Sequence, residues 1–377
     1  MKFIHIADLH LGKILHGFNL NDDQDFILSQ IADIAKKNHV DAVVIAGDVF
    51  DKGVASVEAI RLLRKFLNNL VQNKIKVFLI SGNHDSAERL TFGAEFMSDK
   101  GIYFSKIYDG IIEPVTLNDE HGKINFYLLP FIKPVIVKQI FPDEKIDTYE
   151  DVVRCAISHM NINQSERNVM IAHQNIMNAE HCESEETVIG GLDAVSAACF
   201  EAFDYTALGH LHKCQEVGKN IWYSGTPLKY SISELNHEKT LQLVELNEKG
   251  KITINKIQLK PKRDIRQIRG KLEQIIKMSK DDPNNPEDFI DIILTDEHEV
   301  VDAIYTLRSF YPNIIQMSYD NATTQNQAQF DEIDVSKKIS PLEIFDEFYE
   351  NYAGSPMSDN QREYMKTLIE SIWEGEK

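Results

Sequence analysis

Metal-binding side chains follow short apolar runs at several places in this chain of 377 residues. Each run has a β-type composition and is followed first by glycine or another small residue and then by a carboxylate, an amide or an imidazole. These polar residues are Asp8, His10, Asp48, Asn83, His84, His173, His210 and His212. Carboxylates neutralise divalent cations, whereas imidazole and amide groups complete a coordination shell without adding negative charge. The pattern predicts a centre for two divalent ions.

Two divalent ions about 3.5–4 Å apart stabilise the attack of a bound hydroxide on a phosphodiester and the charge that develops on the leaving oxygen. A carboxylate that lies between the ions can bridge them. Asp48 is the predicted bridge, because it follows the apolar run 42–46 and lies in the sequence Gly-Asp-Val-Phe-Asp. A lone histidine such as His173 is more often a core residue, so the order of the motifs carries the prediction of phosphate-ester hydrolysis.

The elements predicted to position these residues are strands of an α/β sheet. Residues 1–260 alternate apolar runs with amphipathic helical stretches at Asp23–Lys37, Val57–Gln72 and Tyr149–His159. Buried strands that end in polar loops gather functional side chains at the carboxyl edge of a sheet. After His212 the runs become shorter and suit a second sheet packed on the first. The predicted fold is an α/β two-sheet sandwich flanked by helices.

Three further segments follow this predicted sandwich. Residues 261–320 have the pattern of a small α/β capping domain, with alternating strands and helices. Residues 321–338 contain a polar run without a hydrophobic period and are predicted to form a linker. Residues 339–377 contain capping-box starts at Ser340 and Ser358, and each predicted helix carries an apolar stripe. Two helices cannot bury both stripes by themselves, so they are expected to dock on the catalytic domain or on a partner protein.

The composition restricts the class of protein. The net charge is −19, from 40 basic and 59 acidic residues, which argues against tight autonomous binding to nucleic acid. Bound divalent ions or a basic partner subunit would account for part of the acidic excess. The four cysteines form no C-x-x-C pair, so neither a disulfide framework nor a thiolate zinc site is expected. Without a signal core or a bilayer-length apolar stretch, the chain is expected to be cytoplasmic and free of membrane.

The order of the motifs resembles that of the calcineurin-like metallophosphoesterases: Asp-x-His, Gly-Asp, Gly-Asn-His-Asp, a strand-terminal His and Gly-His-x-His. The resemblance implies one ion on Asp8, His10, Asp48 and His212 and another on Asp48, Asn83, His173 and His210. It leaves His84 without a metal. A histidine beside the phosphate can stabilise the transition state or protonate the leaving alkoxide, and this is the role predicted for His84. Asp85 is predicted either to orient His84 or to cap the following helix.

Longer blocks at residues 6–17, 82–90 and 223–231, the last followed by Glu234, resemble the SbcD family, the nuclease subunits of bacterial SbcCD complexes. This resemblance implies a manganese-dependent nuclease in DNA repair, recombination and replication. Its implied substrates are double-stranded DNA ends and hairpins, cleaved by 3′ to 5′ exonuclease and single-strand endonuclease activity. It also implies that the C-terminal helices bind the SMC-like ATPase SbcC, within a heterotetramer that contains a homodimer of this chain. The sequence has no Walker motif, which agrees with an ATPase on a separate chain.

Contacts with DNA are predicted within the same blocks. The candidates are Lys13, His16, Arg89, Lys229 and Tyr230. Surface charge or packing is the alternative for each of them. Archaeal and eukaryotic relatives carry a histidine just after the Gly-Asp block, where this chain has Asp51. The difference leaves any role of a second histidine in exonuclease action without a carrier.

Two other functions compete with this prediction. The sequence Gly47 to Gly53 resembles phosphoprotein phosphatases, so a phosphatase or cyclic-nucleotide phosphodiesterase is one alternative. That alternative predicts a chain without a capping domain or docking helices. A catalytically inactive scaffold is the other alternative, but such proteins typically lose metal ligands, and all the predicted ligands are present.

Overall fold

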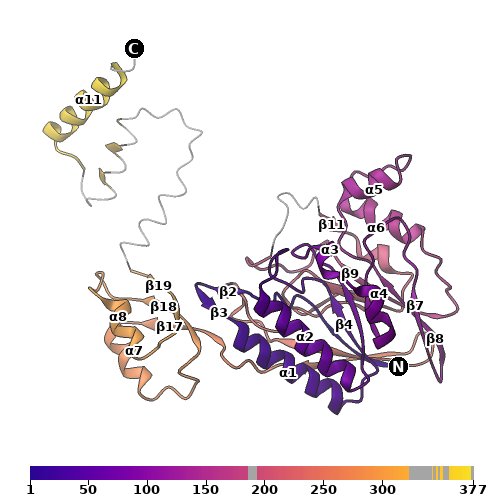
Figure 1. The fold of residues 1–377 in the computed structure, drawn as a ribbon. Helices are drawn as coiled ribbons and strands as arrows, with labels where there is room; N and C mark the ends of the chain where they lie inside the picture. Colours follow the sequence, from indigo (N-terminus) through magenta and orange to yellow (C-terminus); the bar gives the residue numbers. More distant parts are fainter. Residues whose placement is uncertain (186–192, 322–341, 343–344, 347–348, 351–355, 375–377) are drawn as a thin grey trace. The chain divides into compact units, whose positions relative to one another are not determined.

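The computed structural model describes residues 1–185, 193–321, 342, 345–346, 349–350 and 356–374 (Figure 1). The chain divides into two compact units. The first is Met1–Gln267 with Asn284–Asp291 and Asn313–Gln316, and the second is Ile268–Pro283, Ile292–Pro312 and Met317–Lys377. In the described part of the chain, no helix has both the length and the apolar character needed to cross a membrane. The predicted linker, apart from Asn321, and most of the first predicted C-terminal helix lie outside the described residues.

The first sheet of the first unit has the strand order β16-β15-β1-β4-β5-β6. Its strands are β1 (Lys2–Ile6), β4 (Ala42–Ala46), β5 (Lys76–Ile80), β6 (Ile102–Phe104), β15 (Thr240–Leu246) and β16 (Ile252–Gln258). Strands β1, β4, β5 and β6 are parallel, and β15 and β16 are antiparallel neighbours at one edge. Strand β4, with the sequence AVVIA, is buried at every position, as expected for a parallel strand that is covered on both faces.

The second sheet has the strand order β13-β14-β12-β9-β8-β7. Its strands are β7 (Val115–Asp119), β8 (Gly122–Leu128), β9 (Arg167–His173), β12 (Tyr205–Gly209), β13 (Gln215–Gly218) and β14 (Ile221–Tyr223). The four inner strands are parallel, and the edge strands β7 and β13 are antiparallel to their neighbours. The carboxyl ends of the inner strands therefore meet at one edge of this sheet, as they do in the first sheet.

Apolar side chains from both sheets form a shared core. Phe78 of the first sheet stacks on Phe126 of the second, with ring centroids 4.1 Å apart. Phe3 makes an edge contact with Tyr205 at 5.7 Å. His5 crosses the same interface, because its Nδ1 lies 2.9 Å from the hydroxyl oxygen of Tyr205. These contacts join the two sheets into the predicted sandwich, and that part of the fold prediction is confirmed.

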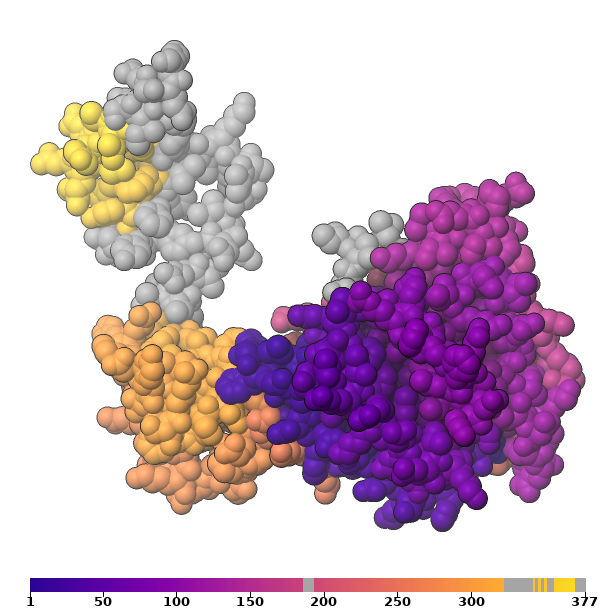
Figure 2. Space-filling model, viewed as in Figure 1, coloured from indigo at the N-terminus to yellow at the C-terminus, as the bar shows by residue number. Residues whose placement is uncertain are grey.

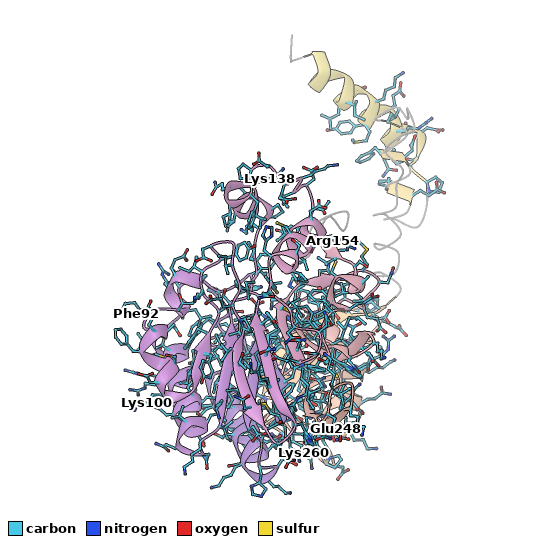
Figure 3. All side chains as sticks on the ribbon, turned by 90° about the vertical axis from the view of Figure 1, so that its right-hand side faces the viewer. Phe92, Lys100, Lys138, Arg154, Glu248 and Lys260 are labelled. Carbon is cyan, nitrogen blue, oxygen red and sulfur yellow. The ribbon has the colours of Figure 1, made fainter. Side chains whose placement is uncertain are left out.

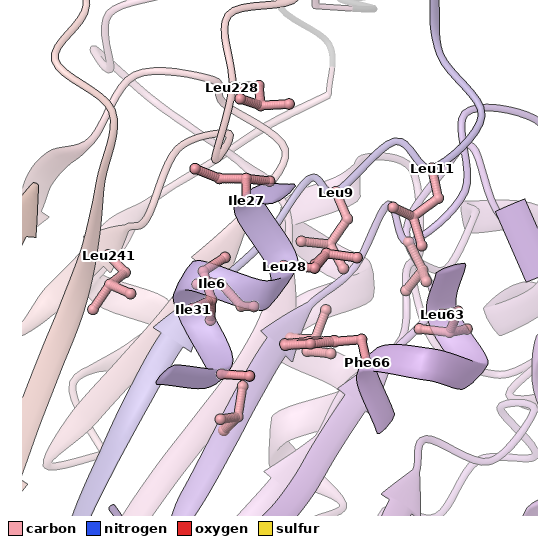
Figure 4. Close-up of a cluster of buried hydrophobic side chains, with 14 of the residues drawn as sticks. Ile6, Leu9, Leu11, Ile27, Leu28, Ile31, Leu63, Phe66, Leu228 and Leu241 are labelled. Carbon is pink, nitrogen blue, oxygen red and sulfur yellow. The ribbon is translucent and has the colours of Figure 1, made fainter. Parts of the chain in front are cut away.

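Helices cover the outer face of the first sheet. Helix α1 (Asn21–Lys37) and helix α2 (Val57–Gln72) bury their apolar faces against it. Figure 4 shows this layer, in which Ile27 and Ile31 of α1 and Phe66 of α2 lie in one cluster with Ile6 of β1. Helix α2 begins where the Ser56 side chain accepts a hydrogen bond from the amide of Ala59, a typical N-cap. Burial of one such large aliphatic or aromatic side chain contributes about 1.5–3 kcal/mol.

The outer face of the second sheet is covered by α6 (Tyr149–Ser158), which begins at a capping box formed by Thr148 and Asp151. Helix α5 (Pro134–Ile140) lies in the part of the first unit that projects at the upper right in Figure 2. Shorter elements complete this unit. They are β2 (Ile14–Leu15), β3 (Phe18–Asn19), α3 (Ala87–Leu90), α4 (Ala94–Met97), η1 (Ser98–Lys100), β10 (Asn175–Ile176), β11 (Ala194–Val195), η2 (Ala197–Phe200) and η3 (Ile232–Glu234).

A three-stranded sheet with the order β17-β18-β19 follows in the chain. Its elements are β17 (Ile265–Gly270), α7 (Leu272–Ser279), β18 (Phe289–Leu294), α8 (Ala303–Arg308) and β19 (Ile314–Tyr319). This is the predicted alternation of strands and helices. The second predicted C-terminal helix is α11 (Asp359–Glu374), which starts at the Ser358 capping position, where the Ser358 amide donates to Gln361 Oε1 at 2.9 Å.

One fold prediction is wrong. The short runs after His212 were expected to form the second sheet, but β15 and β16 extend the first sheet beside β1. Only β13 and β14 join the second sheet, whose centre is built from the earlier strands β8, β9 and β12. The pairing of β1 with β15 joins Lys2 to Glu245, and a local sequence pattern contains no information about so distant a partner.

Candidate metal centre

Every predicted metal ligand lies at or just beyond the carboxyl end of a strand. The first sheet supplies Asp8 and His10 after β1, Asp48 after β4 and Asn83 after β5. The second sheet supplies His173 at the end of β9, and His210 and His212 after β12. Because the parallel strands of both sheets end on the same side, these side chains converge. The sequence-predicted set is thus assembled into one site, and the assignment of each residue to an ion stays a prediction.

Asp48 lies at the middle of this site. Its Oδ2 is 3.4 Å from Nε2 of His173 and 3.8 Å from Nε2 of His10. It is a member of two groups of potential ligand atoms that lie within 4.8 Å of one another, Asp8 with Asp48 and His173, and His10 with Asp48 and His84. This central position agrees with the bridging role predicted for Asp48, which stays a prediction.

Asn83 lies between the imidazoles of His173 and His210. Its Oδ1 lies 2.9 Å from Nε2 of His173 and 3.1 Å from Nδ1 of His210. The three residues were predicted to share one ion with Asp48. Nε2 of His173 and Nδ1 of His210 both face Oδ1 of Asn83. A bound ion would replace these two short contacts.

The loops that carry the ligands have unusual backbone geometry. Asp8, His10, Asp48 and His210 have φ angles of 53°, 41°, 47° and 106°, in the left-handed region that residues with a side chain rarely adopt. Hydrogen bonds between loops hold them there, since the amides of Asp8 and His10 donate to the carbonyl oxygens of Gly47 and Asp48, both at 3.0 Å. Backbone strain of this kind clusters at functional sites.

Two glycines make room for the ligands. A Cβ atom at Gly82 would lie 2.1 Å from Oδ1 of Asp48, and one at Gly209 would lie 2.8 Å from Nδ1 of His173. No side chain fits at either position without displacing a ligand. The glycines of the Gly-Asn-His-Asp and Gly-His-x-His motifs are therefore explained by close approach of the backbone to the site.

Unpaired polar atoms show that the residues fit bound cations. In the described part of the chain, Oδ2 of Asp8 and both ring nitrogens of His10 are buried without a hydrogen-bond partner. A buried polar atom left in this state costs roughly 1–3 kcal/mol. Divalent ions would satisfy these lone pairs, and the mixed set of carboxylate, imidazole and amide donors suits Mn²⁺, Zn²⁺ or Fe²⁺.

The electrostatics of the site agree with a cationic occupant. Burial raises the pKa of Asp48, but the charge and hydrogen bond of His173 outweigh burial and hold it below its ordinary value. Burial raises the pKa of Asp8 to about 7, since its lone pairs receive too little compensation. Burial also lowers the pKa of His210 to about 3, which keeps its imidazole neutral and able to bind a metal.

His84 lies beside this set and is half-buried. Its Nε2 is 3.9 Å from Oδ2 of Asp48, and its Nδ1 is 3.1 Å from the carbonyl oxygen of Asp51. Asp85 accepts hydrogen bonds from the amides of Val49, Phe50 and Gly82 at 2.9–3.1 Å. Asp85 thus joins the loop after β4 to the loop after β5 by hydrogen bonds. Neither predicted role of Asp85 included this contact.

The five predicted DNA contacts differ in accessibility. His16 and Arg89 are exposed, and Arg89 donates to the carbonyl oxygen of Gly53 at 3.1 Å. Lys13 is paired with Asp51 at 2.8 Å, and Lys229 with Asp264 at 3.0 Å. Tyr230 is buried, and its hydroxyl donates to the carbonyl oxygen of Leu9. Packing, the alternative given above, is the role that the structure supports for Tyr230.

Residues around His212 were not predicted as part of the site. They are Ser184, Glu185, Glu234 and Lys239, and all of them hydrogen-bond to His212 or to one another. Glu234 lies three residues after the end of the block 223–231, which is the signal that marks it in the sequence. Ser184, Glu185 and Lys239 have no comparable signal.

Comparison with known proteins agrees with this geometry. Residues 1–214 match the family model of calcineurin-like phosphoesterases, and residues 261–352 match the model of the type 5 capsule protein repressor C-terminal domain. The chain is 32% identical over 381 residues to the SbcD subunit of nuclease SbcCD from Staphylococcus epidermidis, with 100% of both chains covered.

Two solved structures also match at lower similarity. A dimetal phosphatase from Danio rerio is 13% identical with a TM-score of 0.42, covering 68% of this chain and 95% of that one. TT1561 of Thermus thermophilus is 10% identical with a TM-score of 0.37, covering 68% of this chain and 98% of that one. By the family model and the full-length relative, the chain belongs to the calcineurin-like phosphoesterases and, among these metal-dependent hydrolases, to the SbcD family of nuclease subunits.

Proposed function

We propose that the chain is the two-metal nuclease subunit of an SbcCD-type complex and hydrolyses phosphodiesters at DNA ends and hairpins. The expected activities are 3′ to 5′ exonuclease on duplex DNA and endonuclease on single strands, in DNA repair, recombination and replication. The observation that carries the proposal is that Asp48 belongs to two of the three groups of potential ligand atoms found in the described residues, at the carboxyl ends of the strands of both sheets. Membership of the nuclease family supports DNA as the substrate.

The proposed metal ligands fall into two sets that share Asp48. Asp8, His10, Asp48 and His212 hold one ion, and Asp48, Asn83, His173 and His210 hold the other. When bound, the ions supply an activated hydroxide and neutralise charge on the phosphate oxygens. We assign manganese to both positions, since imidazole and carboxylate donors together suit it.

His84 is the proposed general acid of the reaction. Its Nδ1 faces the Asp51 carbonyl oxygen at 3.1 Å, which fixes the orientation of the ring and directs Nε2 towards Asp48. In the imidazolium form, Nε2–H can donate to the leaving oxygen of a phosphodiester bound beside Asp48. Asp85 helps to maintain this geometry, because its hydrogen bonds join the loops that carry Asp48 and His84.

The remaining segments have proposed partners. We assign residues 1–260 to the nuclease domain, 261–320 to a DNA-binding capping domain, 321–338 to a linker and 339–377 to the segment that docks on the SbcC ATPase. Tyr364 of α11 is 69% exposed, as expected of a stripe that contacts another chain. The net charge of −19 favours basic surface on the partner, and Lys13, His16, Arg89 and Lys229 are the proposed DNA contacts on this chain.

The proposed homodimer is supported by exposed apolar residues of the first unit. Val57 and Ile60 at the start of α2, and Phe92 and Phe96 around α4, are between 51% and 86% exposed. Figure 3 shows Phe92 projecting from the outside of the unit. The Arg89 hydrogen bond to the Gly53 carbonyl oxygen joins the two segments that carry these side chains. Exposed apolar residues of this kind on a soluble protein mark a contact with another protein. We propose that the second copy of this chain binds there. The resulting heterotetramer is expected to be cytoplasmic.

Cleavage of DNA by the purified chain tests this function. Manganese-dependent cleavage of end-labelled duplex and hairpin DNA is measured with and without the co-expressed ATPase and ATP, and Asp48→Ala is the control. The expected result is cleavage by the wild type but not by Asp48→Ala, with a higher rate when the ATPase is present. Turnover of a small phosphate ester without cleavage of any DNA substrate would instead indicate a phosphatase or cyclic-nucleotide phosphodiesterase.

A further inference from the structure

A buried carboxylate lies directly behind His212. Glu234, at the end of η3, is fully buried, and its Oε1 lies 3.1 Å from Nδ1 of His212. The same oxygen accepts hydrogen bonds from the hydroxyl of Ser184 at 2.8 Å and from the amide of Tyr230 at 3.3 Å. The other oxygen, Oε2, accepts from the hydroxyl of Thr226 at 3.2 Å. The carboxylate is therefore fixed from several directions before it meets the imidazole.

Lys239 is the charged partner of Glu234. Its Nζ forms an ion pair with Oε2 of Glu234, and both side chains are almost completely buried. The same ammonium donates to the carbonyl oxygen of His212 at 3.1 Å and to Oγ1 of Thr226 at 2.6 Å. The amide of His212 in turn donates to Oε1 of Glu185 at 2.6 Å. Main chain and ring of His212 are thus held at three separate atoms.

We propose that Glu234 is a positioning residue of the metal centre, which accepts the Nδ1 proton of His212 and so presents the Nε2 lone pair to the ion shared with Asp8 and His10. A neutral imidazole carries one ring proton, and an acceptor at Nδ1 keeps that proton on Nδ1. Nε2 is then free to bind a cation. A carboxylate in this position also makes the imidazole a stronger donor and fixes the plane of its ring.

A comparison within the same site favours positioning over simple packing. His173, the corresponding ligand from β9, has its Nδ1 2.9 Å from the carbonyl oxygen of Ala46, so a main-chain acceptor orients that ring. His212 lies in the loop beyond β12, where the charged side chain of Glu234, 3.1 Å from Nδ1, takes the place of such a carbonyl. The Ser184 hydroxyl, 2.8 Å from the same Nδ1, donates its proton to Glu234 and so belongs to the same acceptor group. A buried ion pair such as Glu234 with Lys239 contributes little net stability compared with apolar residues of the same volume. Because Glu234 contacts the proposed ligand His212, orienting that imidazole is a better explanation of the pair than stability.

The inference rests on the proposed metal centre, and a matched pair of double variants tests it. Glu234→Gln with Lys239→Met keeps an acceptor oxygen for His212 and removes the buried ion pair. Glu234→Leu with Lys239→Met removes the acceptor at position 234 as well, so that Ser184 Oγ, 2.8 Å from Nδ1 of His212, is left without the carboxylate that accepts its own proton. Binding of Mn²⁺ by the full-length protein is measured by calorimetric titration, after the thermal unfolding of each metal-free variant has been compared.

The expected result is that the Gln variant binds two ions as the wild type does, whereas the Leu variant binds one of the two about 10–100-fold more weakly. Asp119→Ala is the control for loss of an ion pair with a buried member, because it removes the partner of the buried Arg167 at the opposite end of β9 from His173. It should lower the unfolding temperature and leave both Mn²⁺ affinities unchanged. Equal affinities in the Gln and Leu variants would overturn the inference, whereas failure of the wild type to bind two ions would overturn the metal centre itself.

The wild type provides a second test that does not depend on the folding of any variant. Histidine labelled with ¹⁵N in the Zn²⁺-loaded full-length protein reports which ring nitrogen of His212 carries the proton, and a His212→Gln variant assigns the signal. A proton on Nδ1 is expected. A proton on Nε2, with the metal on Nδ1, would contradict the role given to Glu234.

Discussion

The Nδ1 atom of His173 lies 2.9 Å from the carbonyl oxygen of Ala46, which joins the last residue of β9 in the second sheet to the last residue of β4 in the first. The other ring nitrogen of His173 is 3.4 Å from Asp48, two residues beyond Ala46. One imidazole therefore couples the packing of the two sheets to the position of the proposed bridging ligand. Changes to the site and changes to the sandwich are expected to affect each other.

Asp48→Ala is expected to abolish binding of at least one ion and to reduce DNA cleavage by about 10³-fold or more, since the paired ions contribute several kcal/mol to the transition state. Metal content by mass spectrometry and cleavage of labelled duplex DNA measure the two effects. Asp25→Ala, which breaks an exposed ion pair with Lys65 on the helical layer, is the control and should change neither. Full nuclease activity in Asp48→Ala would disprove the assignment of the centre.

His84→Ala is expected to keep both ions and to lose about 10²–10⁴-fold in the rate of cleavage, because only the proposed proton donor is removed. The rate with saturating Mn²⁺ and the Mn²⁺ titration together distinguish this outcome from loss of metal. His121→Ala, at the turn between β7 and β8, is the matched control. An active His84→Ala protein would mean that a different group protonates the leaving oxygen.

Gly82→Ala is expected to weaken metal binding and to destabilise the fold by roughly 1–3 kcal/mol, because the new Cβ would lie 2.1 Å from Oδ1 of Asp48. Gly53→Ala is a suitable comparison, since the nearest atom to its Cβ would be 3.7 Å away. Chemical denaturation and Mn²⁺ titration of both variants measure the difference. Similar behaviour of the two would show that the ligand loops tolerate displacement.

His5 is expected to make the fold less stable in mild acid. Burial lowers the pKa of its imidazole to about 3, whereas the unfolded chain keeps a pKa near 6.5. The unfolded state therefore binds the proton more readily, and stability falls as the pH drops below about 6.5, by up to about 1.4 kcal/mol per pH unit.

Urea denaturation in the presence of a chelator checks this dependence. The wild type is expected to lose about 1 kcal/mol more than His5→Gln between pH 7 and pH 5.5, because Gln has no titrating group and the other residues are common to both proteins. Parallel stability curves for the two proteins would show that His5 becomes protonated in the folded state without cost.

Deletion of residues 335–377 is expected to leave a folded catalytic domain that no longer co-purifies with the SbcC ATPase. The reason is that the apolar stripe of α11, including Tyr364, is assigned to the partner. Circular dichroism of the truncated chain and affinity purification of the co-expressed pair measure the two properties. If the truncated chain still binds the ATPase, the docking surface lies elsewhere on the molecule.

The local order of apolar runs and polar residues was sufficient to predict which side chains meet at one edge of the fold, because a parallel strand places whatever follows it at a known edge. Their assignment as metal ligands stays a prediction. The same pattern did not predict which sheet each strand joins. Asp85 was predicted to orient His84 or to cap a helix, since the sequence cannot reveal that the amides of Val49, Phe50 and Gly82 donate to its carboxylate. Glu234 was missed as a site residue for a related reason: its partner His212 is 22 residues away and is brought close only by the loop after β12.

The central place of β1 in the first sheet has a consequence for synthesis on the ribosome. Strand β4 emerges soon after β1 and can pair with one of its edges, but the other edge pairs with β15, which includes Leu243 and Glu245. Until that part of the chain has been made, β1 presents unpaired backbone groups, and an exposed edge of this kind promotes aggregation. The nascent protein is therefore most in need of chaperones during translation of the middle of its sequence, before the last strands close the sheet.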